Sequence, residues 1–258
     1  ADLMLHKRVE LSSLIMIEAG KTIDEATADV DEAIDFVNFY IREQAKIEQT
    51  DEYSARGVVG VIAPWNFPLA IPCGMTVAAL VAGNSALLKP AEQTMLISKR
   101  LVELAHEAGI PEDVLQISLG DGAVGAKIVD HELIVGIVFT GSRAVGEMIY
   151  RKISSQRTSS RYDFDPVNKF AITEMGGKNA IIVTNNCELD ETVSGIIYSA
   201  FAHAGQKCSA ASRIIVDNQI KEAFLKRFVR AIEDIKVGPS TNFATFVNPL
   251  ISKEDALR

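Results

Sequence analysis

Residues 58–89 read VVGVIAPWNFPLAIPCGMTVAALVAGNSALLK: a short apolar run, a turn with prolines and aromatics, a longer apolar run and a second short apolar run. Run lengths and flanking residues predict a strand over 58–63, a helix over 69–81 and a strand over 86–89. Apolar strands separated by a helix are typical of crossover units in a parallel sheet. The stretch therefore predicts an α/β fold.

The same alternation continues along the chain. Further strands are predicted over 114–118, 135–139, 171–173, 180–183 and 214–216, and further helices over 95–107, 123–130, 144–153, 189–202 and 220–236. Ahead of them, apolar positions recur at helical spacing over 3–46 with a break at Gly20, which predicts two amphipathic helices. We expect a Rossmann-type, mainly parallel sheet with helices on both faces, and no clear element over the last residues.

Composition excludes several classes of protein. The chain has 258 residues, 48% of them hydrophobic, and can bury a sizeable core. Its net charge of −8 gives no basic field for nucleic acid, and no long uninterrupted apolar window indicates a membrane span, so we expect neither partner. The three cysteines lack CxxC spacing, which argues against disulfides and a metal site and favours a reducing, cytoplasmic compartment.

One cysteine lies at a junction between a helical run and a strand. Cys208 is part of Gly205-Gln206-Lys207-Cys208-Ser209. Two interpretations are open, because a free cysteine is often a small buried hydrophobe, whereas a thiol supplied with a base and an oxyanion donor is a nucleophile. His203 precedes Cys208 by five residues, a spacing that gives no evidence for a Cys–His hydrolase.

A rigid turn follows the first predicted strand. Pro64-Trp65-Asn66-Phe67-Pro68 places an amide where ligands bind in open α/β sheets, at the carboxyl end of a strand. The Asn66 side chain can donate to a developing oxyanion. It can equally cap the helix predicted to begin near Leu69.

Two charged residues end the second predicted strand, in Lys89-Pro90-Ala91-Glu92. A lysine there can reach a ribose or phosphate oxygen, and Glu92 can accept hydrogen bonds from ribose hydroxyls. Because the carboxylate would repel a 2′-phosphate, the pair favours NAD over NADP. The alternative is a solvated lysine with a glutamate that complements the dipole of the next helix.

Two more motifs end later strands. Phe139-Thr140-Gly141-Ser142 offers backbone N–H groups to a pyrophosphate, or Ser142 simply caps a helix. Glu174-Met175-Gly176-Gly177-Lys178 joins two predicted strands and offers a carboxylate as a general base, or is only a turn.

Together, these five motifs resemble the aldehyde dehydrogenase superfamily, in its order and near its spacing, over roughly residues 3–250. The resemblance implies Cys208 as nucleophile, Glu174 as the base that activates water, and Asn66 as oxyanion donor together with the Cys208 N–H. It also implies an aldehyde substrate, a homo-oligomer and NAD as cofactor. The implied NAD site is lined by Ile62, Pro64, Trp65, Lys89, Glu92, Gly125, Gly141, Ser142, Val145 and Met175.

The same resemblance implies a domain organisation. Residues 1–174 would form N-terminal helices and an NAD-binding domain, and residues 175–258 part of a catalytic domain. The family's later Glu-x-Phe-Gly-Pro motif is absent, and 48–56 is short for its oligomerisation hairpin. We therefore expect a truncated chain.

Two details are similar to one branch of this family, which acts on glutamate γ-semialdehyde, the open form of 1-pyrroline-5-carboxylate. Ser209 directly follows the nucleophile, and a polar stretch at 154–168 lengthens the link before Glu174. Two other activities stay open: a CoA-acylating aldehyde dehydrogenase, and an NAD-binding fragment without turnover. Glu174 favours the hydrolytic enzyme, because CoA-acylating members generally lack that base.

Overall fold

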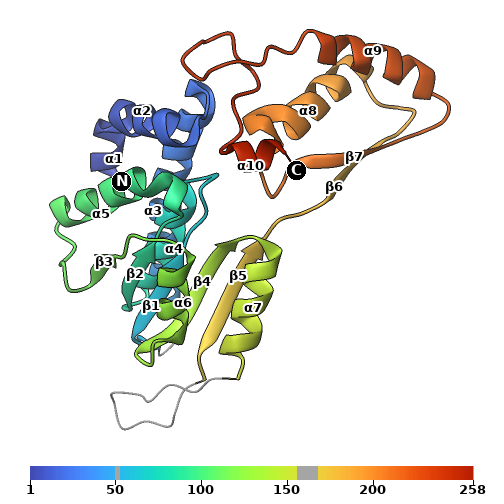
Figure 1. Ribbon diagram of the computed structural model, residues 1–258. Coiled ribbons are helices and arrows are strands. Elements are labelled where there is room, and N and C mark those ends of the chain that lie inside the picture. The colour runs from blue at the N-terminus through green and yellow to red at the C-terminus, as the bar shows by residue number, and fades with distance from the viewer. Residues whose placement is uncertain (50–52, 156–167, 258) are drawn as a thin grey trace. The chain divides into compact units, whose positions relative to one another are not determined.

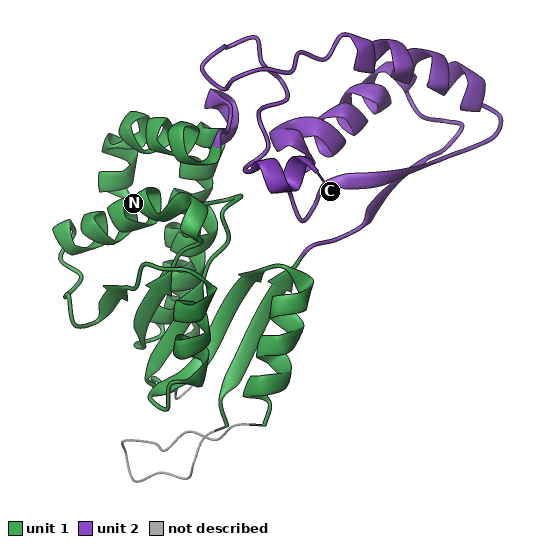
Figure 2. Cartoon of the chain, viewed as in Figure 1, with its two compact units in different colours: residues 1–19, 26–175 green, residues 20–25, 176–258 purple. Residues whose placement is uncertain are grey.

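The computed structural model describes residues 1–49, 53–155 and 168–257 (Figure 1). The chain divides into two compact units (Figure 2). Unit 1 comprises Ala1–Ala19 and Ala26–Met175, and unit 2 comprises Gly20–Glu25 and Gly176–Arg258. The polar loop expected over 154–168 lies mostly outside the described residues.

Unit 1 contains a parallel sheet. Its strands are β1 (Val58–Ile62), β2 (Ser85–Lys89), β3 (Leu115–Ile117), β4 (Ile134–Gly141) and β5 (Phe170–Met175). They lie in the order β3-β2-β1-β4-β5, and every neighbouring pair is parallel. The mainly parallel sheet predicted from the alternation of apolar runs is therefore confirmed.

The last two strands of this sheet are longer than predicted. β4 continues to Gly141 and β5 to Met175, with Thr140 opposite Glu174 and Gly141 opposite Met175. Glu174 therefore lies within a strand, and the expectation that it belongs to a link or turn is wrong. The apolar pattern predicts that this strand ends at Thr173, whereas in the structure hydrogen-bonded pairing with β4 extends it through Glu174.

The helices of unit 1 lie close to their predicted bounds. They are α4 (Ala70–Val81), α5 (Met95–Glu107), α6 (Gly122–Asp130) and α7 (Arg143–Ile153), with a short 3₁₀ turn, η1 (Glu92–Thr94), before α5. The N-terminal region differs, because three helices replace the expected two: α1 (Asp2–His6), α2 (Arg8–Ala19) and α3 (Ile23–Ile47). The bend at Lys7, with φ −98° and ψ 11°, hardly disturbs the apolar spacing and so escapes a periodicity analysis.

Helices cover both faces of the sheet. On one face, Val61 and Leu88 share a core with Leu11, Ile15 and other residues from α2 to α5. On the other face, apolar residues of β4 pack with α6 and α7, and their buried members are Ile128, Val129, Ile134, Ile137, Phe139, Ile149 and Ile153. Burial on both sides explains why the strands read as apolar runs.

Asp29 on α3 fixes the start of α4. The residue is 1% exposed, and its Oδ1 atom accepts a hydrogen bond of 2.7 Å from the Ala70 N–H. A carboxylate at a helix N-terminus is stabilised by the unpaired N–H groups and by the helix dipole. Asp29 therefore anchors the end of the 64–68 turn, although it lies 41 positions earlier in the chain.

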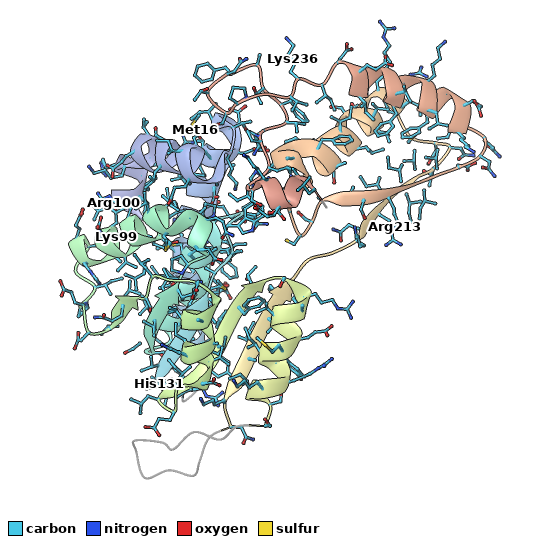
Figure 3. All side chains as sticks on the ribbon, viewed as in Figure 1. Met16, Lys99, Arg100, His131, Arg213 and Lys236 are labelled. Atoms are coloured by element: carbon cyan, nitrogen blue, oxygen red, sulfur yellow. The ribbon has the colours of Figure 1, made fainter. Side chains whose placement is uncertain are left out.

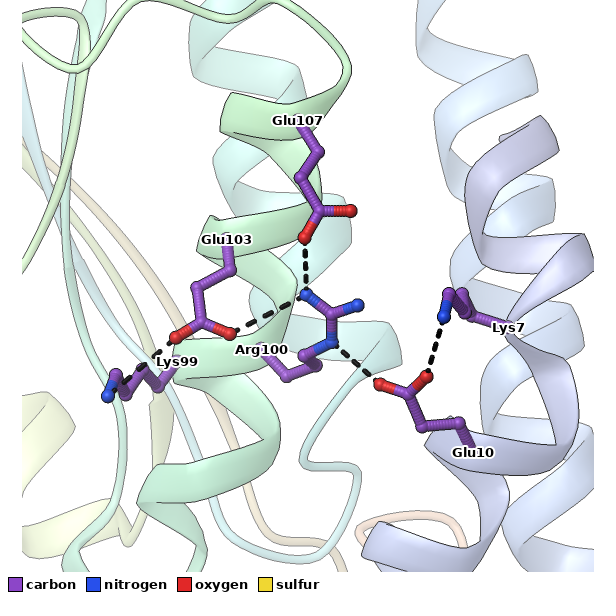
Figure 4. Close-up of polar contacts among 6 residues, drawn as sticks. All are labelled: Lys7, Glu10, Lys99, Arg100, Glu103 and Glu107. Carbon is purple, nitrogen blue, oxygen red and sulfur yellow. Dashed lines mark hydrogen bonds and ion pairs between the residues drawn. The ribbon is translucent and has the colours of Figure 1, made fainter.

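A network of charged residues around Arg100, which Figure 3 labels, joins α2 to α5 (Figure 4). Arg100 bonds Glu10 and Glu107 at 2.7 Å each and lies 3.5 Å from Glu103. Lys7 lies 3.2 Å from Glu10. The Arg100 side chain is 18% exposed, so this guanidinium is the least solvated charge of the group.

We expect Arg100→Gln to lower the thermal midpoint at pH 7 by about 2–4 °C, which corresponds to about 1 kcal/mol for a partly exposed ion network. Hydrogen bonds from Arg100 and Lys7 lower the pKa of the Glu10 carboxyl. Stabilisation from a carboxyl with a lowered folded pKa is present above its unfolded pKa and is lost as the pH falls through the folded pKa.

Thermal melts of the wild type and Arg100→Gln should therefore begin to converge as the pH falls below about 4, the unfolded pKa of a glutamate, toward the lower folded pKa of Glu10. A gap that stays constant down to pH 3 would contradict an electrostatic origin.

Unit 2 is built around two parallel strands, β6 (Asn179–Val183) and β7 (Ala211–Val216). Its helical elements are α8 (Leu189–Phe201), η2 (Ala202–Gly205), α9 (Lys221–Glu233) and α10 (Lys253–Ala256). Val183, Val193, Ile196 and Phe224 form its core. Within the described ranges, no helix is both long and apolar enough to cross a bilayer.

Two predictions for the end of the chain are wrong. The helix expected to reach residue 236 ends at Glu233, because the chain then turns into a bridge between Val237 and Val247. The final residues, expected to lack an element, contain α10, whose first turn is capped by the Ser252 hydroxyl accepting from Asp255 N–H.

Candidate active site

The predicted cofactor residues of unit 1 lie at one edge of its sheet. Ile62 on β1 pairs with Lys89 on β2 and with Phe139 on β4, and Gly141 on β4 pairs with Met175 on β5. All are at or next to the carboxyl ends of parallel strands. The chain order reverses between β1 and β4, since β2 and β3 lie on one side of β1 and β4 and β5 on the other. Ligands of open α/β sheets bind at such a point.

Lys89 is a buried cation at this edge. The residue is 4% exposed, and its Nζ atom lies 3.6 Å from a Glu92 carboxylate whose side chain is 52% exposed. The alternative of a solvated lysine is therefore wrong. A buried ammonium needs polar partners, and a long pair to a half-exposed carboxylate leaves it able to donate to a bound ligand.

Gly125 lies beside this lysine. A Cβ atom on Gly125 would be 3.9 Å from Lys89 Cδ and 4.0 Å from Ile62 Cδ1. The structure thus brings Ile62, Lys89, Glu92 and Gly125 together, and the glycine lets a ligand approach the backbone of α6.

The start of α7 lies at the same edge. Ser142 is the N-cap residue, but its hydroxyl makes no capping hydrogen bond, so the simple side-chain cap considered from the sequence is not observed. Helix starts present N–H groups that suit a pyrophosphate. Gly146 packs against Met175, since a Cβ there would lie 2.7 Å from Met175 Sδ. Val145, on the first turn, is 39% exposed.

The turn with Asn66 connects β1 to α4. Pro64 and Pro68 are buried, while Trp65 and Asn66 are partly exposed. The N-cap residue of α4 is Leu69, and no side chain of that cap bonds the helix. Asn66 is therefore not the N-cap residue of α4, and the first N–H of the helix bonds Asp29.

Glu174 is an exposed carboxylate on β5, in the same unit as Asn66. β5 ends the order of strands in the sheet, and Glu174 is its penultimate residue. An exposed carboxylate at this edge is accessible to water and can accept a proton from it.

Cys208 belongs to unit 2 and lies in a tight turn. It is an exposed free thiol, so the buried-core interpretation is wrong. Ala210 N–H donates to Lys207 O at 3.2 Å, which puts Cys208 and Ser209 in the centre of the turn. Among the described residues, neither the thiol nor the N–H of Cys208 makes a hydrogen bond. An accessible thiol beside an open N–H is what a nucleophile with an oxyanion donor requires.

The other thiols differ from Cys208. Cys73 is 1% exposed, and burial raises the pKa of its thiol to about 12, so it is an inert core residue. Cys187 is partly exposed and packs against the core of unit 2.

The backbone before Cys208 is unusual. His203, Ala204 and Gly205 have φ values of 51°, 54° and 71°, a left-handed run that non-glycine residues rarely adopt. His203 is 1% exposed and its Nδ1 lies 3.3 Å from Asn248 Nδ2 and 4.0 Å from Glu25 Oε2. The buried imidazole thus links the strained turn to Asn248 and Glu25, which are its partners in the contacts given above.

Lys207, next to Cys208, is partly buried. Its Nζ atom lies 5.1 Å from the centroid of the Tyr198 ring, a cation–π contact. Burial lowers the pKa of the Lys207 ammonium, and the Glu25 carboxylate opposes this shift.

Sequence reasoning missed two residues that shape these turns. Asp29 anchors α4, and Asn179 Nδ2 donates to Cys208 O at 2.8 Å. Both act over long sequence separations, so no local signal reveals them. In the part of the chain that the structure describes, no cluster of His, Cys, Asp and Glu side chains suits a metal ion.

Comparison with known proteins gives consistent matches over the whole chain. The model of the aldehyde dehydrogenase family matches residues 1–258. The 1-pyrroline-5-carboxylate dehydrogenase of Bacillus subtilis (strain 168) is 38% identical over 264 residues, which cover 97% of this chain and 50% of that protein. That of Anoxybacillus flavithermus is 40% identical, covering 98% and 51%. The chain spans about half the length of the curated relatives it matches.

Solved structures give the same picture. A 1-pyrroline-5-carboxylate dehydrogenase from Thermus with bound NAD matches with a TM-score of 0.88 and 37% identity, over 98% of this chain and 51% of that chain. Proline utilization A from Bdellovibrio bacteriovorus matches with a TM-score of 0.90 and 40% identity, over 100% of this chain and 28% of that chain.

Proposed function

Because this chain belongs to the aldehyde dehydrogenase family, we propose that the whole protein oxidises an aldehyde to a carboxylic acid with NAD, through a thioester on Cys208. The observation that carries the proposal is the Cys208 turn. It presents an exposed thiol next to a backbone N–H that no described residue uses. We assign NAD binding to residues 1–174 and the nucleophile to the part of the catalytic domain in residues 175–258.

The edge of the unit 1 sheet fits a dinucleotide. Lys89 is buried but not fully neutralised, Gly125 leaves room beside it, and the start of α7 has no side-chain cap. Ile62, Pro64, Trp65, Lys89, Glu92, Gly125, Gly141, Ser142, Val145 and Met175 would hold the cofactor. NAD, when bound, supplies the acceptor for the two electrons that the aldehyde loses.

The protein's own groups carry the remaining steps. The Cys208 thiolate attacks the aldehyde carbon, while the Asn66 amide and the Cys208 N–H stabilise the oxyanion. Oxidation of this adduct leaves an acyl thioester on Cys208. Glu174 accepts a proton from water, which attacks the thioester, and the acid and the free thiol are released.

We further propose glutamate γ-semialdehyde as substrate and glutamate as product, in proline catabolism. Relatives named 1-pyrroline-5-carboxylate dehydrogenase support this, as does Ser209 after the nucleophile. The free cysteines of the described residues favour a cytoplasmic location, and we propose a homo-oligomer on the basis of the family.

The test uses the full-length protein with NAD and glutamate γ-semialdehyde, without CoA. NADH should form, and faster than with an aldehyde of the same length that lacks the α-amino group. Strict dependence on CoA would overturn the hydrolytic reaction in favour of the acylating one. Equal rates with both aldehydes would overturn the substrate assignment alone.

The alternative that the 258-residue chain binds NAD without turnover is favoured by one observation, since every predicted NAD residue lies in unit 1. Calorimetry of this chain with NAD, beside an activity assay, decides the point. Binding without NADH formation supports the alternative, and turnover excludes it.

We expect Glu92→Gln to narrow the preference for NAD over NADP by about tenfold, because the substitution removes a negative charge that would repel a 2′-phosphate. Glu92 is exposed on η1, and glutamine keeps a polar oxygen near the buried Lys89 ammonium, so the variant should fold. Values of kcat/KM for both cofactors give the measurement. Glu112→Gln, an exposed glutamate on another loop, is the control and should leave the ratio unchanged.

A further inference from the structure

We propose that Asn179 is a positioning residue for the Cys208 turn, and that the direction in which the turn presents its thiol depends on the Asn179 side-chain amide. This inference deepens the proposed function and rests on it in taking Cys208 as the nucleophile. Asn179 itself touches no reacting atom in the proposed reaction.

One side-chain amide holds the centre and one end of the turn. Asn179 Nδ2 donates to Cys208 O at 2.8 Å and to Ala210 O at 3.1 Å. The turn's own closing bond, from Ala210 N–H to Lys207 O, is longer, at 3.2 Å. The turn is closed by a single hydrogen bond of its own, and the two bonds from Asn179 on β6 add to it.

The geometry of the peptide unit turns these bonds into a directional constraint. A trans peptide is planar, so a carbonyl and the N–H of the following residue point in opposite directions. When Asn179 fixes Cys208 O, it also fixes the direction of the Ser209 N–H and the backbone torsion that follows Cys208. The two carbonyls then face β6, and the N–H groups of Cys208 and Ser209 are left without a partner among the described residues.

Gly177 makes this approach possible. A Cβ atom at Gly177 would lie 2.8 Å from Cys208 O and 3.0 Å from both Asn179 side-chain polar atoms. No real Cβ tolerates the first distance. The glycine thus leaves room for the Asn179 amide and the Cys208 carbonyl to meet.

β7 holds the backbone of Asn179 in turn. Ser212 Oγ donates to Asn179 O at 3.3 Å, and the Arg213 guanidinium, labelled in Figure 3, donates to Lys178 O. The register between β6 and β7 shifts here, because Asn179 pairs with Ala211 and Ala180 with Arg213. Ser212 is the additional residue, and a bulge of this kind re-aims the chain next to it.

The test compares Asn179→Asp and Asn185→Asp in the full-length protein. Aspartate has the shape of asparagine but turns the donor into an acceptor, so Asn179→Asp removes both bonds and sets a carboxylate against two carbonyls. Asn185 is a matched control, since its Nδ2 bonds Gln219 Oε1 at 2.8 Å in the same unit, away from the turn. Asn179→Ala is a second variant, which loses the bonds without adding charge.

We expect kcat to fall about 10- to 100-fold in both Asn179 variants, the range in which small misplacements of a reacting group act. The KM for NAD should stay within about twofold, because NAD residues lie in unit 1. Hydrogen exchange of residues 206–212 should become faster, while α8 and α9 keep their protection. Asn185→Asp should change none of these quantities.

Wild-type kcat and exchange rates in both Asn179 variants would overturn the inference. So would faster exchange throughout unit 2, which indicates a general structural role. Hydrogen exchange needs neither aldehyde nor NAD, so it tests Asn179 even if the proposed reaction is wrong. Turnover retained by Cys208→Ala would overturn the proposed reaction instead.

Discussion

Cys208→Ala in the full-length protein is expected to reduce aldehyde oxidation by at least about 10⁴-fold, because removing a nucleophile leaves only binding and oxyanion stabilisation. NAD affinity should stay within about twofold, since the thiol takes part in chemistry and not in cofactor contacts. Cys208 is exposed and contributes nothing to a core, so the variant should fold as the wild type does. Initial rates and calorimetry with NAD measure the two effects.

Cys187→Ala serves as the control for this experiment. Its thiol is partly exposed and belongs to the same unit, but it packs against the core near α8. It should retain most of the activity. Full turnover in Cys208→Ala would exclude the thioester, and loss of folding would restore the view that the thiol is structural.

Glu174→Gln is expected to reduce steady-state turnover by about 10²- to 10⁴-fold, because the amide cannot accept a proton from the attacking water. Formation of the thioester does not need this base. A burst of NADH, equal to the number of active Cys208 thiols, should therefore precede the slow phase. Rapid-mixing absorbance measurements separate the burst from the steady state.

Glu132→Gln is a matched control, since Glu132 is an exposed glutamate of the same unit before β4. It should leave both phases unchanged. If Glu174→Gln lost the burst together with the steady state, Glu174 would act before the thioester forms, and its assignment as the hydrolytic base would be wrong.

Much of the fold could be predicted because its signals are local. The apolar runs and their lengths predicted the ends of β1, β2 and α4 to α7 to within one residue. Strands buried on both faces give such continuous apolar runs. The same signals did not predict the end of a strand that backbone pairing extends or the end of a helix at a bend, because neither changes the apolar pattern. β5 continues through Glu174 because β4 offers a partner, and α1 ends at His6 without a break in the apolar pattern.

The candidate site was harder to predict than the fold. Residue types and motifs pointed to Asn66, Lys89, Glu174 and Cys208, but each also had an ordinary structural explanation. The structure removes several of these, since Lys89 is buried, Leu69 rather than Asn66 is the N-cap residue of α4, and Cys208 is exposed. The Cys208→Ala and Glu174→Gln variants test the catalytic roles proposed for two of these residues.

The sequence by itself determined the alternation of strands and helices and the order of the five motifs, because these depend on residue type and spacing along the chain. Only the tertiary structure decided that Asp29 anchors α4, that Lys89 and Gly125 lie together, and that Asn179 holds the Cys208 turn. Hydrogen bonds and burial depend on distances in space, and these contacts join residues about 30 to 40 positions apart. The local pattern of residue types therefore does not predict such pairs.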